Sequence, residues 1–169
     1  MRYLMPLFIL AACATTALAG EGAFTRGPVF TDYGPVADVD VTMPIPPDTT
    51  FKHSFDVSTP APPGDLNSTL VSAARLINMH ARAGIPAGDN RVAIVVHGKA
   101  AKEMADEESA SVELIAALVD QGVRIIVCGQ SAAYYEVATD DLLPGVEMAL
   151  SAMTAHAVLQ QQGYTLNPF

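Results

Sequence analysis

The stretches RVAIVVHG (residues 91–98) and VRIIVCG (residues 123–129) decide the fold of this chain. In each stretch, a nearly unbroken run of aliphatic side chains ends at a residue that is followed by glycine. Unbroken rather than alternating hydrophobicity is typical of strands that are buried on both faces, as in a parallel sheet covered by helices. The two stretches therefore predict two central strands of a mostly parallel sheet.

Helical patterns alternate with strand patterns along the chain. Asp65 is the expected N-cap of a first long helix that stops at Gly84, and Ser109 is the expected cap of a second. Residues 146–150 fit either a strand or the start of the last helix. The expected strands are residues 51–56, 91–96, 123–127 and 164–166, and the expected helices are residues 66–81, 112–119 and 151–162. This alternation predicts an α/β fold with three α/β/α layers.

Residues 1–19 have the pattern of a secretory signal peptide. Arg2 precedes a dense apolar run, and Ala17-Leu18-Ala19 has the small-x-small form that signal peptidase cleaves. Leu10-Ala11-Ala12-Cys13 is a competing pattern, because it resembles a lipobox in which Cys13 is lipidated. We expect an exported protein, periplasmic if it comes from a Gram-negative bacterium, with a lipoprotein anchored at Cys13 as the alternative.

The remaining chain divides into an arm and a domain. Residues 20–50 are rich in proline and glycine and are expected to form an arm that lies extended on the domain or is partly disordered. Residues 51–169 form the expected domain, and no segment after the signal has the roughly 20 apolar residues of an integral membrane segment. The formal net charge of −9 repels phosphate backbones, so no nucleic-acid partner is expected.

Cys128 is the only cysteine that remains once the signal is removed. A cysteine without a partner in an exported chain is buried, reactive or paired between molecules, and its position leaves these alternatives open. Ligands of open parallel sheets bind beyond the carboxyl ends of the strands, where His97-Gly98 and Cys128-Gly129 are expected to share one edge. Cys128 also precedes a predicted helix, whose free N–H groups lower a thiol pKa.

Other kinds of chemistry have no recognisable pattern in the sequence. His53, His80, His97 and His156 lack metal-ligand spacing, so no metal is expected. Gly-x-Gly-x-x-Gly and Walker-type loops are absent, so no nucleotide cofactor is expected. Ser131 lacks the Gly-x-Ser-x-Gly pattern of a hydrolase and is expected to cap a short helix that runs to about Val137.

Several short motifs, in this order and spacing, resemble the DsrE/DsrF-like family. They are DYGP (residues 32–35), RLINMH (75–80), VVHG (95–98), VCGQS (127–131) and QGY (162–164). The resemblance implies a flavodoxin-like α/β/α fold and a homo-oligomer, either a trimer or a hexamer. It also implies that Cys128 carries sulfane sulfur as a persulfide. The neighbours and ligand-binding candidates of Cys128 are then His97, Gly98, Gly129, Gln130 and Ser131.

Two hypotheses of function follow from the resemblance and from the position of Cys128. In the first, the exported protein binds or relays sulfane sulfur through a persulfide on Cys128, which it receives from a donor protein or small thiol and passes to an acceptor. In the second, the protein is a non-catalytic oligomeric module that binds a ligand or partner, and Cys128 is a packed structural residue.

Overall fold

The computed structural model describes residues 20–167 and contains one five-stranded sheet. The sheet order is β4-β3-β2-β1-β5, and every strand pairing in it is parallel. The predicted parallel sheet is thereby confirmed, and residues 146–149 form a strand. The strands are β1 (Phe51–Val57), β2 (Asn90–Val96), β3 (Arg124–Cys128), β4 (Val146–Ala149) and β5 (Thr165–Asn167).

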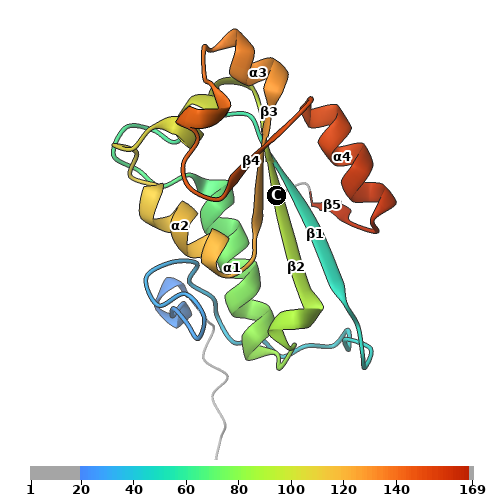
Figure 1. Ribbon diagram of the computed structural model, residues 1–169. Coiled ribbons are helices and arrows are strands. Elements are labelled where there is room, and N and C mark those ends of the chain that lie inside the picture. Colours follow the sequence, from blue (N-terminus) through green and yellow to red (C-terminus); the bar gives the residue numbers. More distant parts are fainter. Residues whose placement is uncertain (1–19, 168–169) are drawn as a thin grey trace, which may run out of the picture.

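Helices cover both faces of the sheet and produce the predicted three layers (Figure 1). Helices α1 and α2 pack on one face, α4 packs on the other, and the short α3 follows β3 at the carboxyl edge. The helices are α1 (Ser68–Arg82), α2 (Val112–Asp120), α3 (Gly129–Tyr134) and α4 (Ala152–Gln161). The 3-10 helices are η1 (Glu21–Ala23), η2 (Ala87–Asp89), η3 (Gly98–Ala105) and η4 (Thr139–Asp141). No helix in residues 20–167 is long and apolar enough to cross a membrane.

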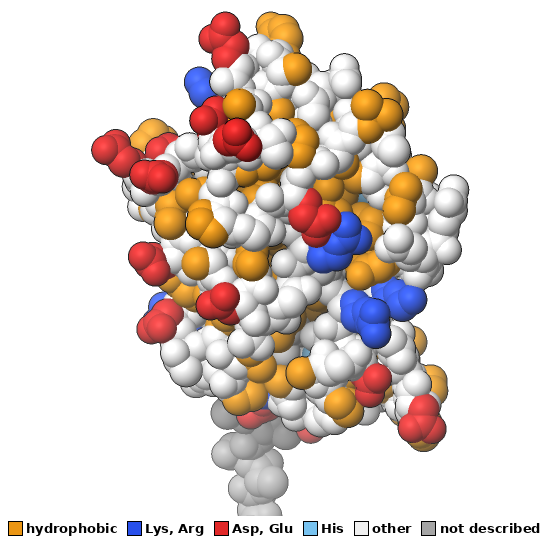
Figure 2. Space-filling view, viewed as in Figure 1, with side chains coloured by type: hydrophobic (Ala, Val, Ile, Leu, Met, Phe, Trp, Pro, Cys, Tyr) orange, Lys and Arg blue, Asp and Glu red, His pale blue; other side chains and the backbone are white. Residues whose placement is uncertain are grey.

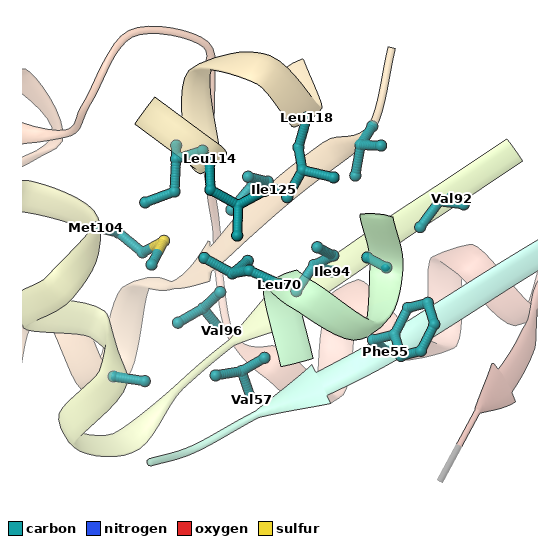
Figure 3. Close-up of a cluster of buried hydrophobic side chains, with 14 of the residues drawn as sticks. Phe55, Val57, Leu70, Val92, Ile94, Val96, Met104, Leu114, Leu118 and Ile125 are labelled. Carbon is teal, nitrogen blue, oxygen red and sulfur yellow. The ribbon is translucent and has the colours of Figure 1, made fainter. Parts of the chain in front are cut away.

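The larger hydrophobic core lies between the sheet and helices α1 and α2 (Figure 3). Ile94 and Ile125 point from the central strands toward Leu70 and Leu114 of the helices, and all four side chains are fully buried. Burying each such side chain stabilises the fold by roughly 1.5–3 kcal/mol. Alternate strand residues pack under α4 in a second, smaller cluster, formed by Ala93, Val95, Ile126, Ala155 and Leu159. The two clusters explain the unbroken hydrophobicity of the central strands.

The helix caps at Asp65 and Ser109 were predicted wrongly, because a buried carboxylate reorganises both helix starts. Helix α1 begins at Ser68, and the side chain of Asn67 accepts a hydrogen bond from the Thr69 amide. Glu103 holds this start in place, because its Oε2 accepts hydrogen bonds from Asn67 Nδ2 at 2.9 Å and from the Ala61 amide at 3.1 Å.

The other carboxylate oxygen of Glu103 holds the start of α2. Glu103 Oε1 accepts a hydrogen bond from the Ser111 hydroxyl at 2.7 Å, and α2 begins at the next residue, Val112. Ser109 lies in the preceding turn, where its hydroxyl accepts the Ser111 amide. The stop of α1 follows the sequence pattern, since Gly84 has a left-handed φ of +79° directly after the helix.

The arm lies against α1, beside the lower part of the helix in Figure 1. Asn78 is fully buried. Its Oδ1 accepts hydrogen bonds from the amides of Val29 and Phe30, and its Nδ2 donates to three carbonyls of the arm. Gly34 has a φ of +59°, and a Cβ at this position would lie 2.3 Å from the backbone nitrogen of Arg75. Glycine is therefore required where the arm touches the helix backbone.

Charged side chains are distributed unevenly over the face shown in Figure 2. Acidic side chains are scattered over the side of α2, the top and the lower right of the molecule, whereas most of the lysine and arginine side chains in this view gather in one small group on the right (Figure 2). An Arg124–Glu147 pair joins β3 to β4 with two short hydrogen bonds of 2.8 and 2.7 Å. The acidic balance of the chain is therefore a property of the exposed surface.

Candidate functional site

His97 and Cys128 lie next to each other at the carboxyl edge of the sheet. Cys128 is the last residue of β3, and His97 directly follows β2. The pairing of Val95 with Ile126 and of Val96 with Val127 leads to this position one residue further on. Because side chains alternate along a strand, His97 and Cys128 share the face of Val95 and Ile126, which is the face that α4 covers.

The Cys128 thiol is a free, buried thiol that is 6% exposed. Burial raises the pKa of this thiol, but hydrogen bonding from the Ser131 hydroxyl and from three backbone amides lowers it by more. The amides belong to Ser131, Ala152 and Gln130, so the donors come from the starts of both α3 and α4. The net result is a thiol pKa below its ordinary value, which favours the nucleophilic thiolate.

Ser131 is not a helix cap, contrary to the prediction. Helix α3 begins at Gly129 with Cys128 as its N-cap and ends at Tyr134, before Val137. Ser131 lies in the first turn, and its hydroxyl accepts a hydrogen bond from the Gly98 amide at 2.9 Å. The proton of the same hydroxyl is not used in that bond, and the hydroxyl donates it to the Cys128 sulfur. Ser131 therefore connects the ends of β2 and β3 and stabilises the thiolate.

The two glycines and Gln130 lie against neighbouring backbone segments at this edge of the sheet. A Cβ on Gly98, which has a φ of +55°, would lie 3.1 Å from the Ser58 carbonyl, and one on Gly129 would lie 2.7 Å from the Ala149 carbonyl. Gln130 donates from Nε2 to the Leu150 carbonyl at 3.2 Å. These residues hold neighbouring backbone segments close together at the edge that carries Cys128.

Asp56 and His156 also belong to the site, although sequence reasoning did not select them. Asp56 Oδ2 accepts a hydrogen bond from His97 Nε2 at 3.0 Å, and Oδ1 accepts one from His156 Nε2 at 2.8 Å. Burial raises the pKa of the Asp56 carboxyl, but the bonds from His156 and His97 outweigh burial and lower it. His156 comes from α4, and its Nδ1 lies 3.4 Å from the Ser54 hydroxyl.

The site contains a nucleophile and an acid–base group but no metal-binding arrangement. Within residues 20–167, no three His, Cys, Asp or Glu side chains are placed to hold a metal ion. A groove at the same edge is lined by residues 60–65, Lys99, Lys102 and Tyr135, and Cys128 is not part of its lining. The arrangement around Cys128 is suited to thiolate chemistry, and the His97–Asp56 pair lies beside it.

Comparisons with known proteins agree with the fold. The structure is similar to that of MTH1491 from Methanobacterium thermoautotrophicum, a protein of unknown function, with a TM-score of 0.56 and 19% identity over 70% of this chain and 99% of that chain. It is also similar to YchN from E. coli, with a TM-score of 0.51 and 17% identity over 70% of this chain and 100% of that chain. No curated protein matches the sequence.

The family comparison covers most of the domain. The DsrE/DsrF-like family model matches residues 52–168, which include all five strands but the first residue of β1. This match contains Cys128, His97 and Asp56. The chain belongs to the DsrE/DsrF-like family.

Proposed function

We propose that the protein is an exported sulfur carrier in which Cys128 holds sulfane sulfur as a persulfide. The observation that carries the proposal is the set of hydrogen-bond donors around the thiol. The Ser131 hydroxyl and the amides of Ser131, Ala152 and Gln130 lower the pKa of Cys128 despite its burial. A thiolate is the form that attacks sulfur, and the same donors stabilise a persulfide anion.

The proposed reaction moves one sulfur atom without net oxidation. The Cys128 thiolate attacks the outer sulfur of a donor persulfide R–S–SH, a new S–S bond forms, and the donor S–S bond breaks to release R–S⁻. With thiosulfate as donor, the leaving group is sulfite. An acceptor thiolate then attacks the outer sulfur of the Cys128 persulfide, which restores the Cys128 thiolate. No metal or cofactor is needed for either step.

Export and assembly are parts of the same proposal. Residues 1–19, which lie outside the described residues, carry the signal-peptide pattern, with lipidation at Cys13 as the alternative. Assembly into a trimer or hexamer is supported by family membership and by exposed apolar side chains near Cys128. Tyr134 is the last residue of α3, and Leu150 and Met153 lie at the start of α4. An exposed apolar patch of this kind is typical of a surface that another protein chain covers.

The test is the intact mass of the protein after treatment with polysulfide. We expect wild-type protein to gain one sulfur atom that a reductant removes, and Cys128→Ser protein to gain none at this position. The variant differs from wild type only at the Cys128 sulfur, so it is a matched control, and peptide mapping locates the added sulfur. No adduct on Cys128 with polysulfide, thiosulfate or a small persulfide would contradict the proposal.

The same experiment addresses the binding-module alternative, which the 6% exposure of Cys128 favours. A packed structural cysteine reacts slowly with water-soluble thiol reagents and takes up no sulfur. Its replacement by serine or alanine would then leave oligomer formation unchanged. A purified protein with this behaviour is a ligand- or partner-binding module.

A further inference from the structure

We propose that His97, held by Asp56, is the general acid that protonates the sulfur leaving group during transfer to Cys128. The inference rests on the proposed function, since it assigns the proton in that reaction. It concerns a group that the thiol environment does not use, because the donors that lower the pKa of Cys128 are Ser131, Ala152 and Gln130.

The Asp56 carboxylate fixes the orientation of the His97 ring. A carboxylate only accepts hydrogen bonds, so the 3.0 Å contact requires His97 Nε2 to carry a proton. Nδ1 is then the ring nitrogen that is left to exchange a proton in the proposed step. His156 holds the other carboxylate oxygen at 2.8 Å, which makes His156 a positioning residue.

The side chains beside the thiol toward β2 are partly exposed to solvent. The start of α3 and the start of α4 supply hydrogen bonds to the sulfur, and β4 lies against Gly129 on a further side. On the side of β2, the His97 side chain is 34% exposed and the Asp56 side chain is 41% exposed. His97 and Asp56 are therefore the solvent-exposed polar side chains on the side of the thiol toward β2 and β1.

The geometry of sulfur transfer places the leaving atom near His97. In an in-line attack the leaving sulfur lies two S–S bond lengths from Cys128 Sγ, which is about 4 Å. Neighbouring strands lie about 4.8 Å apart, and the pairing of Val96 with Val127 places His97, which directly follows β2, beside Cys128. A donor aligned across the strands toward β2 therefore brings its leaving sulfur over His97.

The proton balance of the step is complete. The Cys128 thiolate and the protonated His97 react with R–S–SH to produce the Cys128 persulfide, R–SH and neutral His97. In the transfer to an acceptor, neutral His97 accepts the proton of the acceptor thiol, and the next cycle starts with His97 protonated. Neither direction consumes an oxidant or a reductant.

The charged groups near His97 come from neighbouring elements. Asp56 on β1 binds its ring, His156 on α4 binds the other oxygen of the same carboxylate, and Cys128 on β3 lies beside it. Arg124 and Glu147 lie further along the same face and bind each other at 2.7 Å. Lys52, also on this face, donates to the Gln162 carbonyl.

The test measures the rate of sulfur loading with two small persulfide donors that differ only in the leaving thiol. An aryl thiolate is a good leaving group without protonation, whereas an alkyl thiolate benefits from an acid. We expect His97→Gln to slow loading from the alkyl donor about 100-fold, the lower end of general acid catalysis, and to change loading from the aryl donor only a few-fold. Asp56→Asn should produce the same selective defect at smaller size.

His53→Gln is the matched control, because this histidine lies on the other face near the amino end of β1. Its loading rates should equal those of wild type with both donors. Equal slowing of both donors by His97→Gln, or no slowing at all while wild type loads normally, would overturn the inference and leave the sulfur-carrier proposal intact. A wild-type protein that loads from neither donor would overturn the sulfur-carrier proposal itself.

Discussion

Replacing Ser131 by alanine tests how the protein ionises Cys128. The change removes one hydroxyl donor from the thiolate and leaves the Gly98 amide without its 2.9 Å acceptor. A hydrogen bond to a charged group contributes about 1.5–3 kcal/mol, and each 1.4 kcal/mol changes an equilibrium about 10-fold. The thiolate population below the thiol pKa should therefore fall about 10-fold to 100-fold in Ser131→Ala.

The reaction rate changes less than the thiolate population does. A thiolate whose pKa has risen is a stronger nucleophile, with a Brønsted coefficient of about 0.4–0.5, so about half of the loss is recovered. Alkylation of Cys128 by iodoacetamide should slow about 3-fold to 10-fold at low pH and accelerate by a similar factor once the thiol is fully ionised. The two pH–rate curves therefore cross, and this crossing distinguishes lost ionisation from lost access.

The assay is the pH dependence of alkylation, followed by the mass of the peptide that contains Cys128. Ser109→Ala is the matched control, since its hydroxyl only accepts the Ser111 amide in a turn away from the thiol. A Ser131→Ala curve that superimposes on wild type would refute the role of Ser131. Slowing by one factor at every pH would show that the variant blocks access and would refute it equally.

Three further predictions concern stability. Gly34→Ala should destabilise the protein by more than the roughly 1–3 kcal/mol of a strained backbone and expose the arm to proteases. Gly64→Ala, with a φ of +81° and open space around its Cβ, should cost only the backbone strain. Equal destabilisation by the two variants would contradict the clash of a Cβ at residue 34 with the backbone of α1. Glu103→Gln should lower the free energy of unfolding in urea by about 1–3 kcal/mol, because a neutral amide replaces the charged acceptor of three hydrogen bonds. A change below about 0.5 kcal/mol would contradict this. Burial and then the charge of His80 lower the pKa of His53, and burial lowers the pKa of His80 despite its hydrogen bond to Asn90. The unfolded chain therefore binds more protons than the folded chain does, and the free energy of unfolding should fall as pH drops below about 6.5. His53→Gln should flatten this dependence of the melting temperature between pH 7 and pH 5, and an unchanged slope would contradict it.

The order of strands and helices could be predicted because it depends on local patterns. The continuous runs at residues 92–96 and 123–127 mark strands that are covered on both faces, and the structure shows Ile94 and Val95 in opposite cores. Helix starts were less predictable, because Glu103 draws Asn67 and Ser111 into one buried network across distant segments. A local capping rule contains no information about such a contact.

The candidate site was predictable at Cys128 and His97 but not at Asp56 and His156. The strand-end rule selected the ends of β2 and β3, and it would have selected Asp56 as well if it had been applied to β1. His156 lies 100 residues from Asp56 and comes from α4, so only the tertiary structure brings these two residues together. The role of Ser131 was missed for a similar reason, since its partner is the Gly98 amide at the end of another strand.

Reversible sulfur transfer through Cys128 is the central claim, and labelled sulfur tests it most directly. The protein is loaded from a small persulfide whose outer sulfur carries a heavy isotope, separated from the donor, and mixed with a small acceptor thiol. We predict that the protein gains one labelled sulfur on Cys128, that the acceptor then carries the label, and that the protein mass returns to its starting value. Failure of Cys128 to load, or retention of the label on the protein with no labelled acceptor, would contradict the claim.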